Sequence, residues 1–72
     1  MQAPAVVVDP EILGGTPVIN GTRVRGRILF EHLEAGDSLD AFLADFPSVT
    51  RQQAIYVLEE ARASIASNAN PA

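Results

Sequence analysis

The spacing of apolar residues changes partway along the chain. The apolar and β-branched residues Val18, Ile19, Thr22 and Val24 follow an alternation that is typical of β-structure. From Ile28 onward, apolar residues recur every three or four positions, which is the period of one face of an α-helix. The sequence therefore predicts a short β-ribbon followed by a helical unit.

Two features define the predicted ribbon. The pair Asn20-Gly21 is a strong signal for a two-residue hairpin turn, since both residues tolerate positive φ. Upstream, Val6, Val7 and Val8 form a β-branched run without a polar face, so this strand should be covered on both sides or lie at an edge where another chain can pair with it. These three valines are therefore candidate dimerisation residues.

Capping signals place two helices after the ribbon. The first should run from about Arg27 to Ala35 and end at Gly36, a residue suited to a left-handed cap. The second should begin after Ser38, a good N-cap, and end before Pro47. The apolar stripes of the two helices consist of Ile28, Leu29 and Leu33, and of Leu39, Phe42, Leu43 and Phe46.

The third helix has the best-defined start, because Thr50 and Gln53 form a capping box. Its apolar stripe continues to Ile65, whereas residues 66–72 lack apolar periodicity and should be a disordered tail. We therefore expect one domain over residues 1–65. It should be a mostly α, winged-helix-like helix-turn-helix bundle of three helices with a short N-terminal β-ribbon.

The corner between the second and third helices suggests a role. Residues 47–49 separate them, which fits a helix-turn-helix corner. The first turns of the third helix then carry Arg51, Gln52 and Tyr56, side chains that can read base edges or hold phosphates. The alternative is an ordinary three-helix bundle in which these residues only solubilise an exposed helix.

A second candidate DNA-binding group is the arginine cluster of Arg23, Arg25 and Arg27. Arg23 and Arg25 are two apart on a predicted strand, so they should project from the same face of the ribbon. Guanidinium groups suit bidentate contacts with phosphates or with the carboxylates of a partner protein. The alternative is internal pairing with the acidic residues that follow, Glu31, Glu34 and Asp37.

Length and charge restrict the partners. A chain of 72 residues buries only roughly 60% of its unfolded surface, and without cysteine it has no disulfide, so a homodimer is the expected source of further burial. The net charge of −4 argues against indiscriminate coating of nucleic acid. No apolar stretch reaches the roughly 20 residues of a membrane span, and no secretory signal is visible, so we expect a cytoplasmic protein without membrane contact.

Catalytic and metal chemistry find no support in the sequence. His32 is the only histidine and is expected to be a solvated residue on a helix face. Asp9 lies before a proline in a turn-rich segment, and the hydroxyls of Ser38 and Thr50 are expected to cap helices. We therefore predict no enzyme activity, no metal site and no cofactor.

One motif resembles a known family. The string Gly14-Gly15-Thr16-Pro17-Val18-Ile19-Asn20-Gly21-Thr22-Arg23, followed by a helix ending at Gly36, is similar to domain-of-unknown-function family 433. Its members are small bacterial and archaeal proteins regarded as antitoxin-like, of the VapB kind. The resemblance implies a ribbon-bearing helix-turn-helix fold, and frequent genomic pairing with a nuclease-like toxin of the PIN type.

Two functions are therefore expected. The first is an antitoxin-type regulator of a type II toxin-antitoxin pair: a dimer that binds operator DNA through Arg51, Gln52, Tyr56 and the arginine cluster, and that neutralises a PIN-type toxin through another surface. The alternative is a protein–protein interaction module that does not bind DNA.

Overall fold

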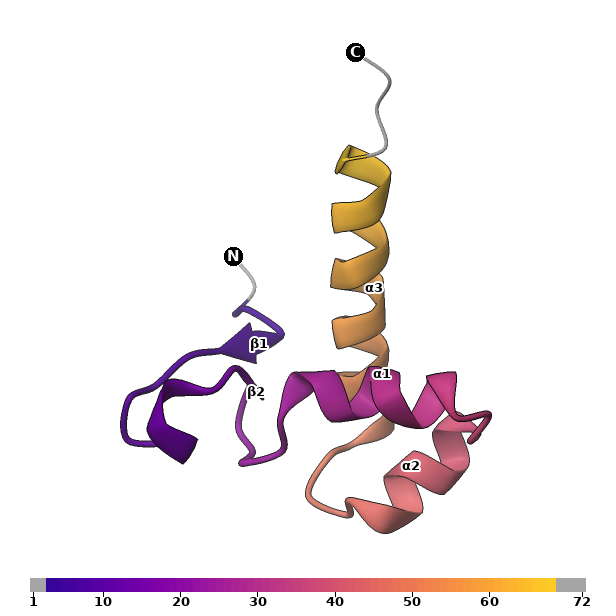
Figure 1. Cartoon of the computed structure of the whole chain (residues 1–72), viewed down its shortest axis with the longest axis horizontal. Helices are drawn as coiled ribbons and strands as arrows, with labels where there is room; N and C mark the ends of the chain where they lie inside the picture. The colour runs from indigo at the N-terminus through magenta and orange to yellow at the C-terminus, as the bar shows by residue number, and fades with distance from the viewer. Residues whose placement is uncertain (1–2, 69–72) are drawn as a thin grey trace.

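Three helices and a two-stranded antiparallel sheet make up residues 3–68, the part of the chain that the computed structural model describes (Figure 1). This confirms the predicted fold class, a mostly helical bundle with a short N-terminal β-ribbon. The elements are β1 (Val6–Val7), a single 3-10 turn (Leu13–Gly15), β2 (Val18–Ile19), α1 (Gly26–Glu34), α2 (Leu39–Asp45) and α3 (Arg51–Asn68).

Strand β2 is the centre of the ribbon. Val6 pairs with Ile19 and Val7 with Val18 on one side, and Val18 forms a β-bridge with Arg25 on the other. Both β2 residues are buried, whereas Val6 and Val7 are half-buried. Strand β1 is therefore an edge strand within residues 3–68, as the run of valines suggested.

The predicted turn at Asn20-Gly21 is present: the Thr22 amide donates to the carbonyl of Ile19 at 2.9 Å, and Gly21 has φ +86°. The loop of the hairpin is longer than the two residues predicted, because the Ile19 amide donates to the carbonyl of Val24 at 2.8 Å and residues 20–23 therefore lie between the paired residues. The reason is Thr22, which is buried: its hydroxyl donates to the carbonyl of Ile19 and accepts from the amide of Val24. The Thr22 side chain thus replaces a main-chain rung of the ladder.

The predicted helix ends hold for α1 and α2. Gly36 has φ +93°, its amide donates to Leu33, and the Asp37 amide donates to the carbonyl of His32, which together form the Schellman arrangement. The Ser38 hydroxyl accepts from the Ala41 amide at 3.1 Å and starts α2. Helix α2 then ends at Asp45, just ahead of Pro47.

The capping box at the start of α3 is confirmed. The Thr50 hydroxyl accepts from the amide of Gln53 at 3.1 Å, and the Gln53 side chain accepts from the amide of Thr50 at 2.8 Å. The helix continues through Asn68, so residues 66–68, expected in the disordered tail, are helical. The rest of the predicted tail, 69–72, lies outside the described residues.

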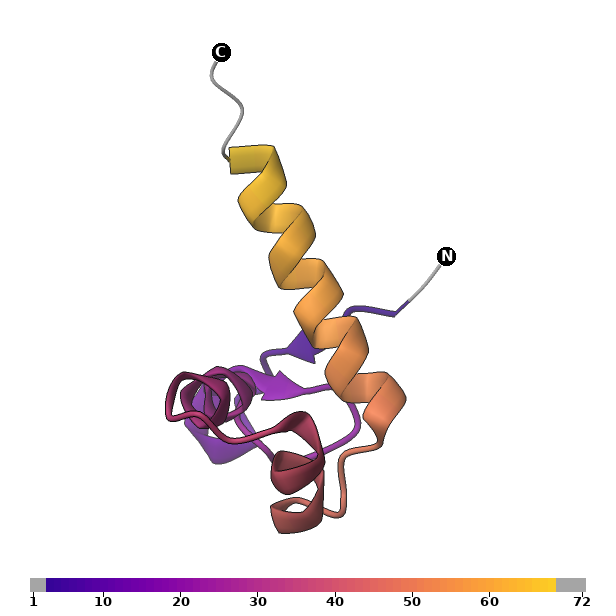
Figure 2. The same ribbon diagram turned by 90° about the vertical axis from the view of Figure 1, so that its right-hand side faces the viewer.

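Helix α3 packs on the other elements along its first half only. Its buried residues, Ala54 and Val57, belong to one hydrophobic core with Ile19 of β2, Leu29 of α1 and Phe42 of α2, while Figure 2 shows the second half of the helix projecting away from the other elements. Among residues 59–67 Ala61 alone is half-buried and the others are exposed, Ile65 by 69%. The fully buried apolar residues of the described chain are Ala5, Val18, Ile19, Leu29, Phe42, Val49, Ala54 and Val57.

Candidate functional site

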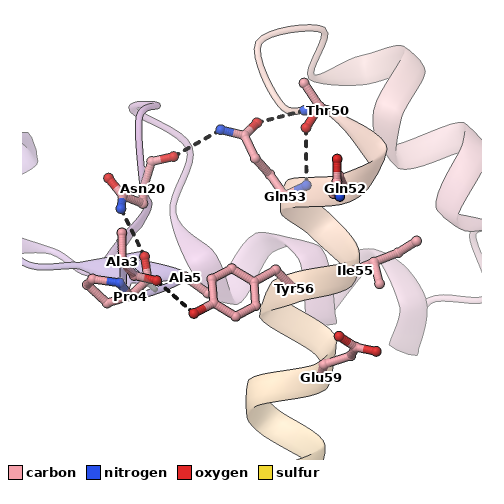
Figure 3. Close-up of a pocket in the computed structure, with 10 residues that line it drawn as sticks. All are labelled: Ala3, Pro4, Ala5, Asn20, Thr50, Gln52, Gln53, Ile55, Tyr56 and Glu59. Atoms are coloured by element: carbon pink, nitrogen blue, oxygen red, sulfur yellow. Dashed lines mark hydrogen bonds between the residues drawn. The ribbon is translucent and has the colours of Figure 1, made fainter. Parts of the chain in front are cut away.

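An open groove lies between residues 3–5, which we call the N-terminal arm, and the first half of α3 (Figure 3). Its volume is about 590 Å³. One wall is the arm together with the turn at Asn20. The other wall is one face of α3, where the side chains at positions 52, 55, 56 and 59 lie one above the other because they are spaced three or four residues apart. The residues that line it are Ala3, Pro4, Ala5, Asn20, Thr50, Gln52, Gln53, Ile55, Tyr56 and Glu59.

Three hydrogen bonds hold the two walls in place. The Tyr56 hydroxyl donates to the carbonyl of Ala3 at 2.7 Å, and the Gln53 amide donates to the carbonyl of Asn20 at 3.0 Å. The Asn20 side chain in turn donates to the carbonyl of Pro4 at 2.9 Å. The groove is therefore formed by the fold itself and needs no ligand to shape it.

Within this groove, Gln52 and Tyr56 are the two predicted site residues that the structure brings together. Gln52 is exposed, and its side chain makes no hydrogen bond to any other residue in the described range 3–68. Tyr56 is half-buried; burial of the hydroxyl, and then the hydrogen bonding and negative charge of Glu60, raise the pKa of Tyr56. Its hydroxyl thus stays protonated and remains a hydrogen-bond donor.

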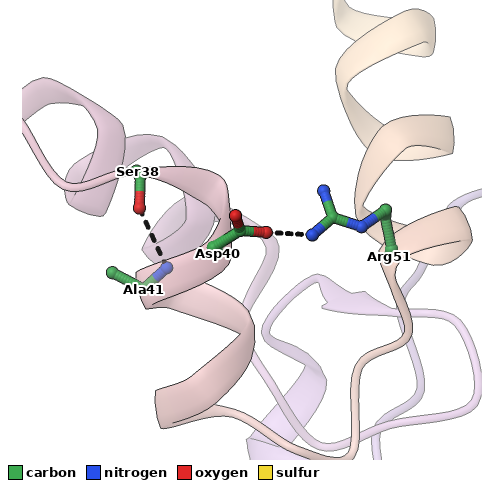
Figure 4. A network of polar contacts seen from close by, with 4 residues as sticks. All are labelled: Ser38, Asp40, Ala41 and Arg51. Atoms are coloured by element: carbon green, nitrogen blue, oxygen red, sulfur yellow. Dashed lines mark hydrogen bonds and ion pairs between the residues drawn. The ribbon is translucent and has the colours of Figure 1, made fainter.

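Arg51 does not line the groove but faces α2. Its guanidinium forms an ion pair with the carboxylate of Asp40, in the first turn of that helix (Figure 4). The Arg51 side chain is still 56% exposed. It remains accessible to solvent, as predicted, but a neighbouring carboxylate offsets its charge.

The three arginines of the predicted cluster lie in different local settings. Arg23 is in the four-residue loop, so the prediction that it shares a strand face with Arg25 fails, because alternation applies only within a strand. Arg25 is half-buried at the N-cap of α1. Arg27 is exposed, and its Nε lies 3.7 Å from a carboxylate oxygen of Glu31. This is the internal pairing that was the alternative to DNA binding for this cluster.

The candidate dimerisation residues differ in exposure. Val6 packs against Gly26, where an added Cβ would lie 3.4 Å from a Val6 methyl group. Val7 is half-buried, and Val8, just beyond β1, is 64% exposed. Of the three, Val8 offers the largest free apolar surface to a second chain.

Sequence reasoning missed two surfaces and misplaced one residue. The groove was missed because Asn20 and Gln53 are 33 positions apart. The second surface is the apolar face on the second half of α3, formed by Leu58, Ala61 and Ile65, where Leu58 still packs against the core but Ile65 is exposed. The spacing of these residues predicts a buried stripe, so nothing in the sequence indicated this exposure.

His32 is the misplaced residue. It was expected in solvent, but its side chain is 23% exposed and its ring lies edge-on to Phe42 and Phe46, with 5.5 Å between ring centroids in each pair. Its Nδ1 is 3.1 Å from the carboxylate of Asp37, a pair that is ionic when the imidazole is protonated. His32 therefore joins α1 to α2, and among residues 3–68 no three His, Asp or Glu side chains gather as a metal ligand set.

The described helices include none with the length and apolar character of a membrane span. No solved structure matches the chain. The uncharacterized protein y4eO of Sinorhizobium fredii (strain NBRC 101917 / NGR234) is 38% identical over 66 residues, which is 92% of this chain and 27% of that protein. The chain thus spans about a quarter of the length of this curated relative.

The family comparison covers most of the fold. A family model described as "Protein of unknown function (DUF433)" matches residues 6–61, from β1 to the middle of α3. The matched range includes the ribbon, α1, α2 and the α3 wall of the groove, but not residues 3–5 of the N-terminal arm. The chain belongs to the DUF433 family.

Proposed function

We propose that this chain is a protein-binding module of the antitoxin type, whose partner is a nuclease-like toxin of the PIN type encoded beside it. The observation that carries the proposal is the second half of α3. Leu58, Ala61 and Ile65 continue the face that Ala54 buries lower on the helix, but this cover decreases along α3: Leu58 and Ala61 are half-buried, and Ile65 is 69% exposed.

Helix stability supports a partner at this face. An isolated helix shorter than about 12 to 15 residues is marginal in water, and most helices in proteins depend on packing of one face. Residues 59–67 are exposed except for the half-buried Ala61, so they gain little from tertiary contacts. A bound protein that covers Leu58 and Ile65 would supply that packing. The helix-in-groove mode of recognition uses apolar anchors at this spacing.

Co-purification with the product of the neighbouring gene tests the proposal. In co-expression, a tagged chain should retain that protein, and Ile65→Glu should abolish retention because it places a charge in the apolar contact. The matched control is Ala63→Glu, which adds the same charge on the opposite, exposed face of the same helical turn. Circular dichroism should show both variants folded, because both sites are exposed.

Two results would contradict the proposal: failure of the unchanged chain to retain the neighbouring protein, or equal loss of retention in both variants. Sedimentation of the purified chain separates a third case. If Leu58, Ala61 and Ile65 instead mediate a homodimer, Ile65→Glu alone will convert a dimer to a monomer, with no second protein present.

Operator binding is a second candidate, supported by one observation. Arg51 and Gln52 are exposed in the first turn of α3, directly after the corner that follows α2. The ion pair of Arg51 with Asp40 and the net charge of −4 weaken this candidate relative to protein binding. A gel-shift assay on the DNA upstream of its own gene tests it.

A further inference from the structure

We propose that the groove between the N-terminal arm and α3 binds an extended, arginine-bearing peptide segment of a partner protein. The groove lies on the face of α3 opposite to Leu58 and Ile65, so it is a second surface, separate from the one on which the proposed function rests.

Charge defines the occupant. Glu59 is the one charged side chain among the residues found to line the groove, and Glu60 follows it beside Tyr56. Arg51, next to Gln52 in the sequence, is held by Asp40 on α2, and Arg62, three positions after Glu59, is exposed but is not among the lining residues. The charged group that a ligand would meet in the lining is therefore a carboxylate, which disfavours the phosphates of nucleic acid, whereas a guanidinium would gain a charge-assisted hydrogen bond from Glu59.

The remaining lining suits a peptide. The Tyr56 ring spans the space between α3 and the arm (Figure 3), and guanidinium groups stack on such rings in addition to pairing with carboxylates. Ile55, 40% exposed, offers an apolar contact to an adjacent side chain. The Gln52 amide can both donate to and accept from a peptide main chain.

The walls are fixed before any ligand arrives, which lowers the cost of binding. The arm is held on α3 by Tyr56, and the turn at Asn20 is held by Gln53. Binding would therefore cost the conformational entropy of ordering the peptide, but not that of ordering the site.

The test is a titration of the isotope-labelled chain, followed by nuclear magnetic resonance, with a short capped peptide of alternating arginine and leucine. Amide shifts should concentrate at Asn20, Gln52, Ile55 and Glu59. Affinity should fall with added salt. Glu59→Gln should weaken binding about tenfold, as expected for loss of a charged hydrogen bond. Glu34→Gln, an exposed carboxylate on α1, is the matched control and should bind as the unchanged chain does.

Two further probes complete the test: the same peptide with glutamate in place of arginine, and a short single-stranded oligonucleotide. Neither should shift the groove amides. The proposal is overturned if the arginine peptide gives no shifts at millimolar concentration, if shifts fall outside the groove, if either further probe binds equally well, or if Glu59→Gln and Glu34→Gln behave alike. Ile65→Glu should still bind the peptide, so failure of the proposed function would not be mistaken for failure of this inference.

Discussion

Tyr56 has a larger role than its sequence position indicated. As a predicted DNA contact it would point into solvent, but its hydroxyl donates to Ala3 and ties the N-terminal arm to α3. Its pKa is raised, first by burial and then by Glu60. The same residue thus lines the groove and joins the N-terminal arm to the first half of α3.

The raised pKa of Tyr56 predicts a loss of stability at high pH. The folded chain keeps the phenol protonated at a pH where the unfolded chain has begun to ionise, so this contribution to stability is complete below about pH 10 and declines as pH rises further. The chain has one tyrosine, no cysteine and no lysine, so few other groups titrate there.

Urea unfolding from about pH 9 to 11 measures this decline. Tyr56→Phe should unfold more easily at neutral pH, because the hydrogen bond to Ala3 is lost, but its free energy of unfolding should be nearly constant over this range. If the unchanged chain shows an equally constant value, Tyr56 is not perturbed by the fold. Absorbance of the tyrosinate form gives an independent reading of the same titration.

At the scale of elements, Gln53 in the first turn of α3 both caps the helix and attaches it to the ribbon loop. Gln53 accepts from the amide of Thr50 as part of the capping box and donates to the carbonyl of Asn20 in the ribbon loop. One side chain therefore fixes both the start of the helix and its angle to the ribbon. The sequence revealed the first contact, because it is local, but not the second.

Gln53→Ala should lower the free energy of unfolding by about 1 to 3 kcal/mol, since it removes a cap contact and a half-buried hydrogen bond. Gln52→Ala is the control: the same side chain, one position earlier, is exposed, and the change should be within about 0.5 kcal/mol. Chemical denaturation of the two variants compares them directly. Equal effects would mean that neither the cap contact nor the contact with Asn20 stabilises the fold.

For the whole molecule, the distribution of charge separates protein binding from DNA binding. The chain carries nine acidic and five basic residues, and two of the arginines proposed to contact DNA, Arg27 and Arg51, lie beside carboxylates. Such exposed pairs stabilise the fold by at most about 1 kcal/mol. Their larger effect is to reduce the positive potential that DNA would meet.

Asp40→Asn therefore tests the DNA-binding candidate. If Arg51 contacts DNA, freeing it should raise affinity for the upstream fragment about fivefold at low salt, and stability should hardly change. Asp45→Asn gives the same change in net charge at the other end of α2 and should have a smaller effect. Equal affinities for all three chains, or no shift at any salt concentration, would exclude this role for Arg51.

Much of the fold followed from the sequence alone. Ser38, Gly36 and the Thr50–Gln53 box set the helix boundaries through contacts between residues at most five apart, and such local contacts are specified wherever the chain folds. The turn at Asn20-Gly21 and the strand at Val6 and Val7 followed from patterns of the same local kind. The pairing of β1 with β2 and the four-residue length of the hairpin loop did not, because the first joins residues far apart in the chain and the second depends on the buried Thr22.

The candidate sites were decided only by the tertiary structure. Which apolar face of α3 is covered, which arginine meets a carboxylate and where the arm crosses the helix all depend on residues that the chain brings together from far apart, such as Asn20 with Gln53 and Ala3 with Tyr56. Apolar periodicity predicts that a face will be buried, but not what buries it. In this protein the second half of α3 has the pattern of a core helix and the exposure of a surface.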